Sequence, residues 1–463
     1  MKNKKLLLDI FMSVCCFAIT LVCIFKGSSR YFLLFTYPLL YLVFYFVIYR
    51  YILFAKNSIF KLFLGIMLFL RYVIMPFLNV LVGYSSWCKN IPTSSNYLLA
   101  QIMMIVEMII IIVVFKFNYK KRQKNNEKIK IDNRFDFVIL LFSIISIVLF
   151  FCFKSKYNIL LHIVIPKTEF SAFESNNIKQ ILILLFNTAK AFLFLLVLKK
   201  VYLKPKKTIF DVLLVLFFCV LNVFIYTGTN RIQLIISFIS SIYLILLVFP
   251  KLKKFLIISS LISFAIILPA ISSFRQAELV SSESTLYDYS QLLNAYLGGV
   301  DNVAISVETA DVFPQYRSIT NFFYDMFRGV LGFNVILKNN HTNVMESDLY
   351  NFVYFGHGDN ASQIVPIVGQ GYFYFDIVGF WIIELFFLIL GLKLEKLFNT
   401  TTNFYLKYTL LVILLRFSIM QGLSGTILAH SISFDCFIPW IIIMLNNYFV
   451  FRKDTLTYDK SKS

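Results

Sequence analysis

Residues 6–25 read LLLDIFMSVCCFAITLVCIF, an almost wholly apolar run that follows Lys2, Lys4 and Lys5. About 20 apolar residues is the length that an α-helix needs to cross the hydrocarbon core of a bilayer. The run has the layout of a secretion signal but lacks a cleavage site of small residues, so we expect it to remain as the first anchor. This stretch predicts an integral membrane protein.

Apolar runs of spanning length recur along the whole chain. Inside lipid every backbone N–H and C=O must be paired within its own segment, so such runs are expected to be helices. They lie at approximately 6–25, 31–54, 60–82, 98–117, 137–153, 180–198, 209–226, 231–249, 255–273, 372–392, 404–421 and 432–450. The predicted fold class is therefore an all-α integral membrane protein of about twelve transmembrane helices.

The composition agrees with lipid as the main solvent. The 463 residues are 59% hydrophobic, with a mean hydropathy of +0.77, which is more apolar surface than a soluble fold hides. No region has a soluble composition, so residues 1–463 are predicted to form a single polytopic membrane domain. The 7 cysteines show neither a disulfide framework nor a zinc spacing, so no metal is expected.

The positive charges predict the orientation. Most of the 44 lysines and arginines fall in the two tails and the even-numbered connections, with the largest group at 116–134. Cytoplasmic loops carry such an excess, so both termini are expected in the cytoplasm. Attraction to an anionic leaflet then explains the net charge of +20, and no nucleic-acid partner is needed to account for it.

The longest polar region, residues 274–363 between predicted helices 9 and 10, then lies outside the cytoplasm. A structureless connection of this length is uncommon, so we expect it to fold and to carry function. Amphipathic patterns at 289–297 and 321–331 predict helices on the membrane surface.

Three arginines are predicted on that outer side. Arg231 closes the turn TGTNR at 227–231, Arg275 ends the next predicted span, and Arg328 lies in the large loop. A guanidinium grips phosphate bidentately, so Arg231, Arg275 and Arg328 are candidates for a diphosphate-binding clamp. A boundary arginine that only reaches for the headgroups explains Arg231 equally well.

The segment FGHGDN at 355–360 supplies the candidate catalytic residues. His357 stands between two glycines, with Asp359 two residues later, which suits a mobile general base. The alternative is a turn in which these residues serve only the backbone. His341 competes for the role, whereas His162 and His430 are interpreted as ordinary interfacial residues.

Charged side chains also occur inside the apolar runs, where burial is costly and a function is the default hypothesis. Pairing within the helix bundle explains them equally well. These residues are Arg71, Glu107, Lys190, Glu384 and Arg416. No P-loop, dinucleotide fingerprint or nucleophile elbow is present, so no nucleotide cofactor is expected.

Three stretches carry a family resemblance: TGTNRIQLI at 227–235, FGHGDNASQ at 355–363 and GQGYFYFDIVGFWIIELFFLILGL at 369–392. With the many spans and the large outer loop, they resemble the Wzy-type oligosaccharide repeat-unit polymerases of O-antigen and capsular polysaccharide, to which the O-antigen ligases are related. Two features depart from the family pattern. Gln370 stands where many members have glutamate, and Arg317 is followed eleven positions later by Arg328 rather than by glycine.

The resemblance implies a glycosyltransferase of the bacterial cytoplasmic membrane that needs neither metal nor nucleotide. It would join undecaprenyl-diphosphate-linked repeat units at the outer face of that membrane, with a chain-length regulator and a flippase as partners. Arg231, Arg275 and Arg328 would neutralise the diphosphate leaving group, and His357 or Asp359 would take the proton of the acceptor hydroxyl. The alternatives are a lipid-linked oligosaccharide flippase, another polysaccharide-related transporter and an O-antigen ligase.

Overall fold

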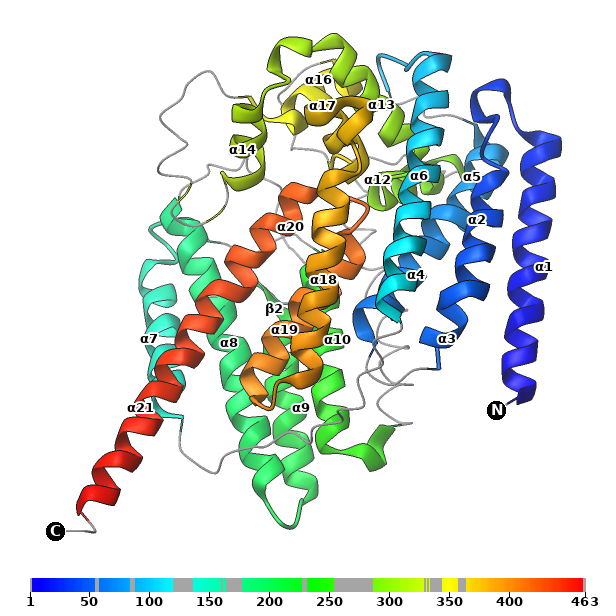
Figure 1. The fold of residues 1–463 in the computed structure, drawn as a ribbon. Helices are drawn as coiled ribbons and strands as arrows, with labels where there is room; N and C mark the ends of the chain where they lie inside the picture. Colours follow the sequence, from blue (N-terminus) through cyan, green and yellow to red (C-terminus); the bar gives the residue numbers. More distant parts are fainter. Residues whose placement is uncertain are drawn as a thin grey trace. The chain divides into compact units, whose positions relative to one another are not determined.

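A computed structural model describes residues 2–54, 58–83, 88–119, 136–159, 161–163, 177–226, 231–253, 286–328, 330, 333, 344–356 and 364–460. Within these residues every element is helical except one pairing of two short strands (Figure 1). The prediction of an all-α fold is confirmed. The chain folds as two compact units, which are described one at a time. Unit 1 comprises Met1–Asn125, Ser282–Lys396 and Leu414–Ser433, and unit 2 comprises Asn126–Ser281, Leu397–Ile413 and Phe434–Ser463.

Six helical segments of the described chain are long and apolar enough to cross a membrane. They are Lys5–Lys26, Ser29–Ile52, Ile59–Val82, Ser94–Asn118, Ile178–Leu203 and Gly425–Phe449. A bent pair of helices makes a seventh span if its two arms are counted as one, and Phe137–Phe153, Ile209–Phe224 and Ile232–Val248 are shorter apolar helices. Several apolar helices of this kind support a membrane-embedded protein. The predicted run at 255–273 lies outside the described residues.

The continuous span predicted at 372–392 is wrong. The structure has α17 (Ile367–Gly379) and α18 (Ile382–Thr400), which meet at an angle of 112°. The backbone of Asp376 is not helical, with φ of 59°. A Cβ on Gly371 would lie 1.9 Å from the carbonyl oxygen of Phe380, so only glycine allows α17 to pack this closely against the bend. Mean hydropathy does not register such a break, because both arms are apolar.

The N-terminal part of unit 1 is a set of long helical segments. Its elements are α1 (Lys2–Lys26), η1 (Ser29–Tyr31), α2 (Thr36–Phe44), η2 (Tyr45–Tyr49), α3 (Arg50–Ile52), α4 (Ile59–Phe69), η3 (Leu70–Ile74), α5 (Met75–Val82) and α6 (Ser94–Tyr119). Helix α1 packs against α2 and α5, and α2 packs against α6. These are the blue and cyan helices of Figure 1. Both η2 and η3 are single π-helical turns, a local widening that often marks a functional position.

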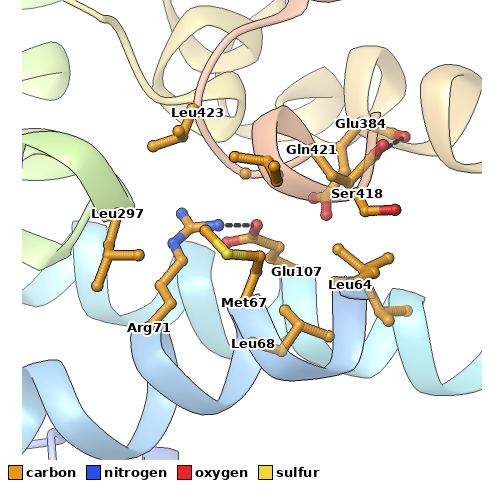
Figure 2. Close-up of a pocket in the computed structure, with 13 residues that line it drawn as sticks. Leu64, Met67, Leu68, Arg71, Glu107, Leu297, Glu384, Ser418, Gln421 and Leu423 are labelled. Atoms are coloured by element: carbon orange, nitrogen blue, oxygen red, sulfur yellow. Dashed lines mark hydrogen bonds and ion pairs between the residues drawn. The ribbon is translucent and has the colours of Figure 1, made fainter. Parts of the chain in front are cut away.

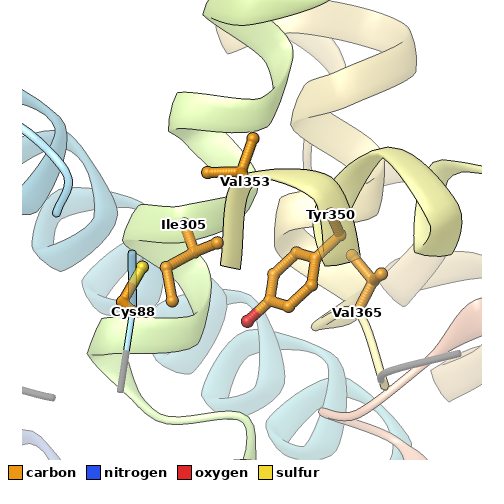
Figure 3. Packing of buried hydrophobic residues seen from close by; sticks show 5 residues of the cluster. All are labelled: Cys88, Ile305, Tyr350, Val353 and Val365. Carbon is orange, nitrogen blue, oxygen red and sulfur yellow. The ribbon is translucent and has the colours of Figure 1, made fainter. Parts of the chain in front are cut away.

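The remainder of unit 1 includes short helices from the predicted outer loop. They are α12 (Leu286–Leu297), α13 (Val300–Val312), η5 (Pro314–Tyr316), α14 (Ile319–Phe327) and α16 (Glu346–Phe355), and α20 (Gly425–Ser431) follows later in the chain. The helices predicted at 289–297 and 321–331 thus correspond to α12 and α14. Helix α13 packs against α6, α16 and α17. Its Ile305 joins Tyr350 and Val353 of α16 in a buried apolar cluster with Cys88 and Val365 (Figure 3). This cluster holds α16 in place beside α13.

Unit 2 contains the remaining apolar helices. Its elements include α7 (Phe137–Phe153), α8 (Asn177–Leu203), α9 (Ile209–Phe224), α10 (Arg231–Val248), η4 (Pro250–Leu252), the first part of α19 (Phe404–Met420), part of η6 (Ile432–Phe437) and α21 (Ile438–Lys460). The strands β1 (His162–Ile163) and β2 (Ile225–Tyr226) pair antiparallel. Asp136 accepts hydrogen bonds from Lys199, Tyr405 and Asn446, which ties α8, α19 and α21 to the start of α7.

Candidate functional site

The structure describes one of the five predicted site residues completely. Arg328 directly follows α14 in unit 1. Arg231 begins α10 in unit 2, but its side chain lies outside the described residues, as do Arg275, His357 and Asp359 entirely. The diphosphate clamp and the histidine base therefore stay predictions, and Arg328 is the point from which a site can be built.

Helix α14 places Arg328 beside an acid. Ser318 caps the helix by accepting a hydrogen bond from the backbone N–H of Asn321 at 3.1 Å. Positions three apart share a helix face, so Asp325 and Arg328 point the same way. The distance from Arg328 Nε to Asp325 Oδ1 is 3.9 Å, and the Arg328 side chain is 29% exposed. Among the described residues, the guanidinium is thus loosely paired, and its side chain is partly exposed.

Two more acids from α16 lie close to this pair. Glu346 interacts electrostatically with Asp325, and Asp348 interacts with both Asp325 and Arg328. Glu346 is fully buried and Asp348 is half-buried. We call Asp325, Arg328, Glu346 and Asp348 the Arg328 cluster. It combines one guanidinium with three carboxyl groups from two short helices.

Gln370 supports the Arg328 cluster through hydrogen bonds. It is the residue at which the chain departs from the pattern of the family that it resembles. Its Nε2 donates to Asp325 Oδ2 at 3.0 Å and to Thr426 Oγ1 at 2.7 Å. Its Oε1 accepts from the backbone N–H of Gly425 at 3.0 Å. Tyr374, one turn later on α17, also donates to Asp325, at 3.3 Å. Gln370 therefore connects α14, α17 and α20, and a neutral amide here can donate to Asp325 as a glutamate carboxylate cannot.

The three carboxyl groups differ in their environments. Burial raises the pKa of Asp325, while the charge of Arg328 and the hydrogen bonds from Gln370 and Tyr374 oppose that rise. Neither oxygen of Glu346 has a hydrogen-bond partner among the residues that the structure describes. Burial raises the pKa of Glu346 well above its usual value, and the Asp325 carboxylate raises it further. Burial also raises the pKa of Asp348, opposed by Arg328. Several carboxyl groups with raised pKa values at one location are typical of acid–base sites.

His430 is a member of this neighbourhood that the sequence interpretation missed. It lies on α20, which packs against α14, and it interacts electrostatically with Arg328. Its Nε2 is buried and has no hydrogen-bond partner among the described residues. The sequence around His430 carries no local signal, because only the packing of α20 on α14 brings it close to Arg328.

The charges inside the predicted spans mostly find partners within their own unit. In unit 1, Arg71 pairs with Glu107 (Figure 2). In the same unit, Arg416 Nη1 lies 3.5 Å from Ser431 Oγ. In unit 2, Lys190 donates to the backbone carbonyls of Ile225 and Asn222. Internal pairing, one of the two interpretations, therefore accounts for these basic residues. Glu384 is different, because neither of its carboxylate oxygens has a hydrogen-bond partner among the described residues.

Comparisons with known proteins leave the resemblance untested. No family model matches the chain, and neither the curated proteins nor the solved structures contain a match. Within the described residues, no group of three His, Cys, Asp or Glu side chains is arranged to hold a metal ion.

Proposed function

We propose that the chain is a membrane glycosyltransferase that polymerises undecaprenyl-diphosphate-linked oligosaccharide repeat units, and that Arg328 binds the diphosphate of the donor. The observation that carries the proposal is the Arg328 cluster. A partly exposed guanidinium lies beside carboxyl groups with raised pKa values, in the segment expected outside the cytoplasm. This is the chemistry that glycosyl transfer from a diphosphate donor needs.

The reaction follows from these groups. The acceptor hydroxyl oxygen attacks the anomeric carbon of the donor, and the bond from that carbon to the diphosphate oxygen breaks. The leaving diphosphate keeps the electron pair, and Arg328 stabilises the charge that develops on it. The hydroxyl proton passes to a base. Asp348 is the half-buried carboxylate beside Arg328 that can take it, with Asp325 and Glu346 buried behind as positioning residues.

The residues predicted from the sequence keep their roles in the proposal. Arg231 and Arg275 stay candidates for binding the diphosphate, and His357 or Asp359 stays the alternative to Asp348 as the base. The finer topology also belongs to the proposal: about twelve spans, both termini in the cytoplasm, and residues 274–363 on the outer face of a bacterial cytoplasmic membrane. Accessibility tags in 120–130 and in 280–350 test this orientation, because a cytoplasmic signal from the second region would overturn it.

Polymerase and flippase are separated by one reconstitution. Proteoliposomes that contain the chain and a defined lipid-linked repeat unit should produce glycans of two or more units on undecaprenyl diphosphate. Reorientation of the lipid across the bilayer without any longer product would indicate a flippase. Transfer to an added lipid A acceptor without elongation would indicate a ligase. Either outcome would refute the polymerase proposal.

A further inference from the structure

A small cavity lies inside unit 1, and none of the four residues of the Arg328 cluster lines it. Its volume is about 20 Å³, and its walls include Leu64, Leu68 and Leu297 together with Arg71, Glu107 and Glu384 (Figure 2). One water molecule needs roughly 10–15 Å³ in this measure. The cavity is thus large enough for a water molecule, and it is lined by both apolar and ionisable groups.

Glu107 is fully compensated by its neighbours. It lies on α6, is 0% exposed, and its Oε1 accepts from Arg71 Nη1. Its Oε2 accepts from the hydroxyl of Tyr72 at 2.9 Å. The π-helical turn η3 carries both Arg71 and Tyr72, so both side chains reach the same carboxylate. Arg71 also donates from Nε to the backbone carbonyl of Gly298 at 3.0 Å. Arg71 and Glu107 therefore form a neutral, hydrogen-bonded pair.

Glu384 faces the same cavity without such compensation. It lies in the first turn of α18, is 0% exposed, and neither of its oxygens has a hydrogen-bond partner among the described residues. Gln421 donates from Nε2 to the backbone carbonyl of Glu384 at 3.1 Å, and its Oε1 is buried and has no hydrogen-bond partner in the part of the chain that the structure describes. The cavity is thus lined by two residues, Glu384 and Gln421, whose side-chain oxygens accept no hydrogen bond from any described residue.

The charges of Glu384, Glu107 and Arg71 also favour a bound proton. Glu384 interacts electrostatically with Glu107, Arg71 and Tyr72, and Glu107 also with Tyr37. Two ionised carboxylates against one guanidinium would leave a net negative charge in a region of low dielectric, which is strongly unfavourable. Close carboxylates resolve this by sharing a proton. A metal ion would need about six oxygen ligands, more than the free oxygens of Glu384 and Gln421 supply.

We propose that Glu384 and Glu107 hold one exchangeable proton between them and that the cavity admits the water that delivers it. This is a binding site separate from the glycosyl-transfer cluster, and its ligand is a proton. Ionisable groups buried within membrane helices commonly form proton relays. Loss of the proton would place two like charges against each other and push α18 away from α6, so the packing of unit 1 depends on its occupancy.

The test is infrared difference spectroscopy on the full chain in lipid nanodiscs at neutral pH. The wild-type chain minus Glu384→Gln should show the C=O stretch of a protonated carboxyl group, shifted when H₂O is replaced by D₂O. The matched control is Glu395→Gln on the same helix, because Glu395 is paired with Lys61 at 3.2 Å whereas Glu384 has no such partner among the described residues. Its difference spectrum should lack that band.

A second variant keeps the test independent of how Glu384→Gln folds. In Glu107→Gln, Glu384 is the remaining carboxylate beside Arg71 and should ionise, so the same band should disappear. Retention of the band in both glutamine variants would overturn the proposal, as would its absence from the wild-type chain. A band that appears only when sodium is withdrawn would also overturn it, by assigning the cavity to a metal cation.

Discussion

Two regions of unit 1 each set one arginine among several buried acids, and they do so in different ways. Arg71 is 4% exposed and is committed to Glu107 at hydrogen-bond distance. Arg328 is 29% exposed, and its Nε lies 3.9 Å from Asp325 Oδ1. The first arginine is held by long helices and the second by short ones. The difference indicates that Arg71 compensates a charge inside the protein, whereas Arg328 has the partial exposure that the proposed diphosphate binding requires.

The largest effect expected from this comparison concerns folding stability. Arg71→Met keeps the length of the side chain but leaves Glu107 and Glu384 without a cation. Removing one partner of a buried ion pair costs about 3–5 kcal/mol. Arg328→Met should change the free energy of unfolding by about 1 kcal/mol or less, because that pair is long and partly exposed. Thermal unfolding of both variants in detergent measures the two costs, and equal losses would erase the distinction between the two arginines.

The pH dependence of stability provides a second, smaller test. Burial raises the pKa of Asp301 on α13 to about 6, while hydrogen bonds from Tyr31 and Asn294 oppose the rise. The folded state then holds a proton that the unfolded state releases near pH 4. Asp301 should therefore lower the stability as pH rises from about 4 to about 6, by roughly 3 kcal/mol in total. Unfolding of wild-type chain and Asp301→Asn across this range measures the slope, and an unchanged slope in the variant would exclude Asp301 as its source.

The acids of the Arg328 cluster should differ from one another in activity. If Asp348 takes the proton of the acceptor, Asp348→Asn should slow elongation about a hundredfold. Because burial raises the pKa of Asp348, wild-type activity should fall with decreasing pH at a higher value than an ordinary aspartate would give. Rates of product formation between pH 4 and 8 would show this limb. His357→Ala is the variant for comparison. Of Asp348→Asn and His357→Ala, the variant with the larger loss of elongation rate identifies the base.

Much of the fold can be predicted from hydropathy alone. The residues of the sites can be predicted only in part, because tertiary packing decides which of them come together. Apolar runs predicted the helices α1, α6 and α8, because lipid enforces helix over any long apolar segment. The charge of Arg328 and its place in the predicted outer loop make it a candidate from the sequence alone. Its neighbour Asp325 is visible in the sequence as a position three residues earlier. Glu346, Gln370 and His430 come from other helices, and only tertiary packing brings them to Arg328.

The same limit applies to the proton site. Arg71, Glu107 and Glu384 were each identified by a charge inside an apolar run, and the alternative of internal pairing was open. Which acid pairs with Arg71 depends on the π-helical turn that carries it and on the bend before α18. Neither feature has a hydropathy signal. The sequence therefore identifies the three residues, but it does not show that two carboxyl groups face a single guanidinium.

The most direct measurement of the central claim is the single-turnover rate of glycan elongation by Arg328→Lys. Lysine keeps the positive charge but loses the bidentate geometry that a diphosphate requires. The proposal predicts a rate at least about tenfold below that of the wild-type chain, with normal protein yield and monodispersity. Arg317→Lys is the matched control, because Arg317 forms an ion pair with Asp376 at 3.0 Å. This variant should elongate glycans at the wild-type rate. Wild-type rates from Arg328→Lys would contradict the assignment of Arg328 to the leaving diphosphate.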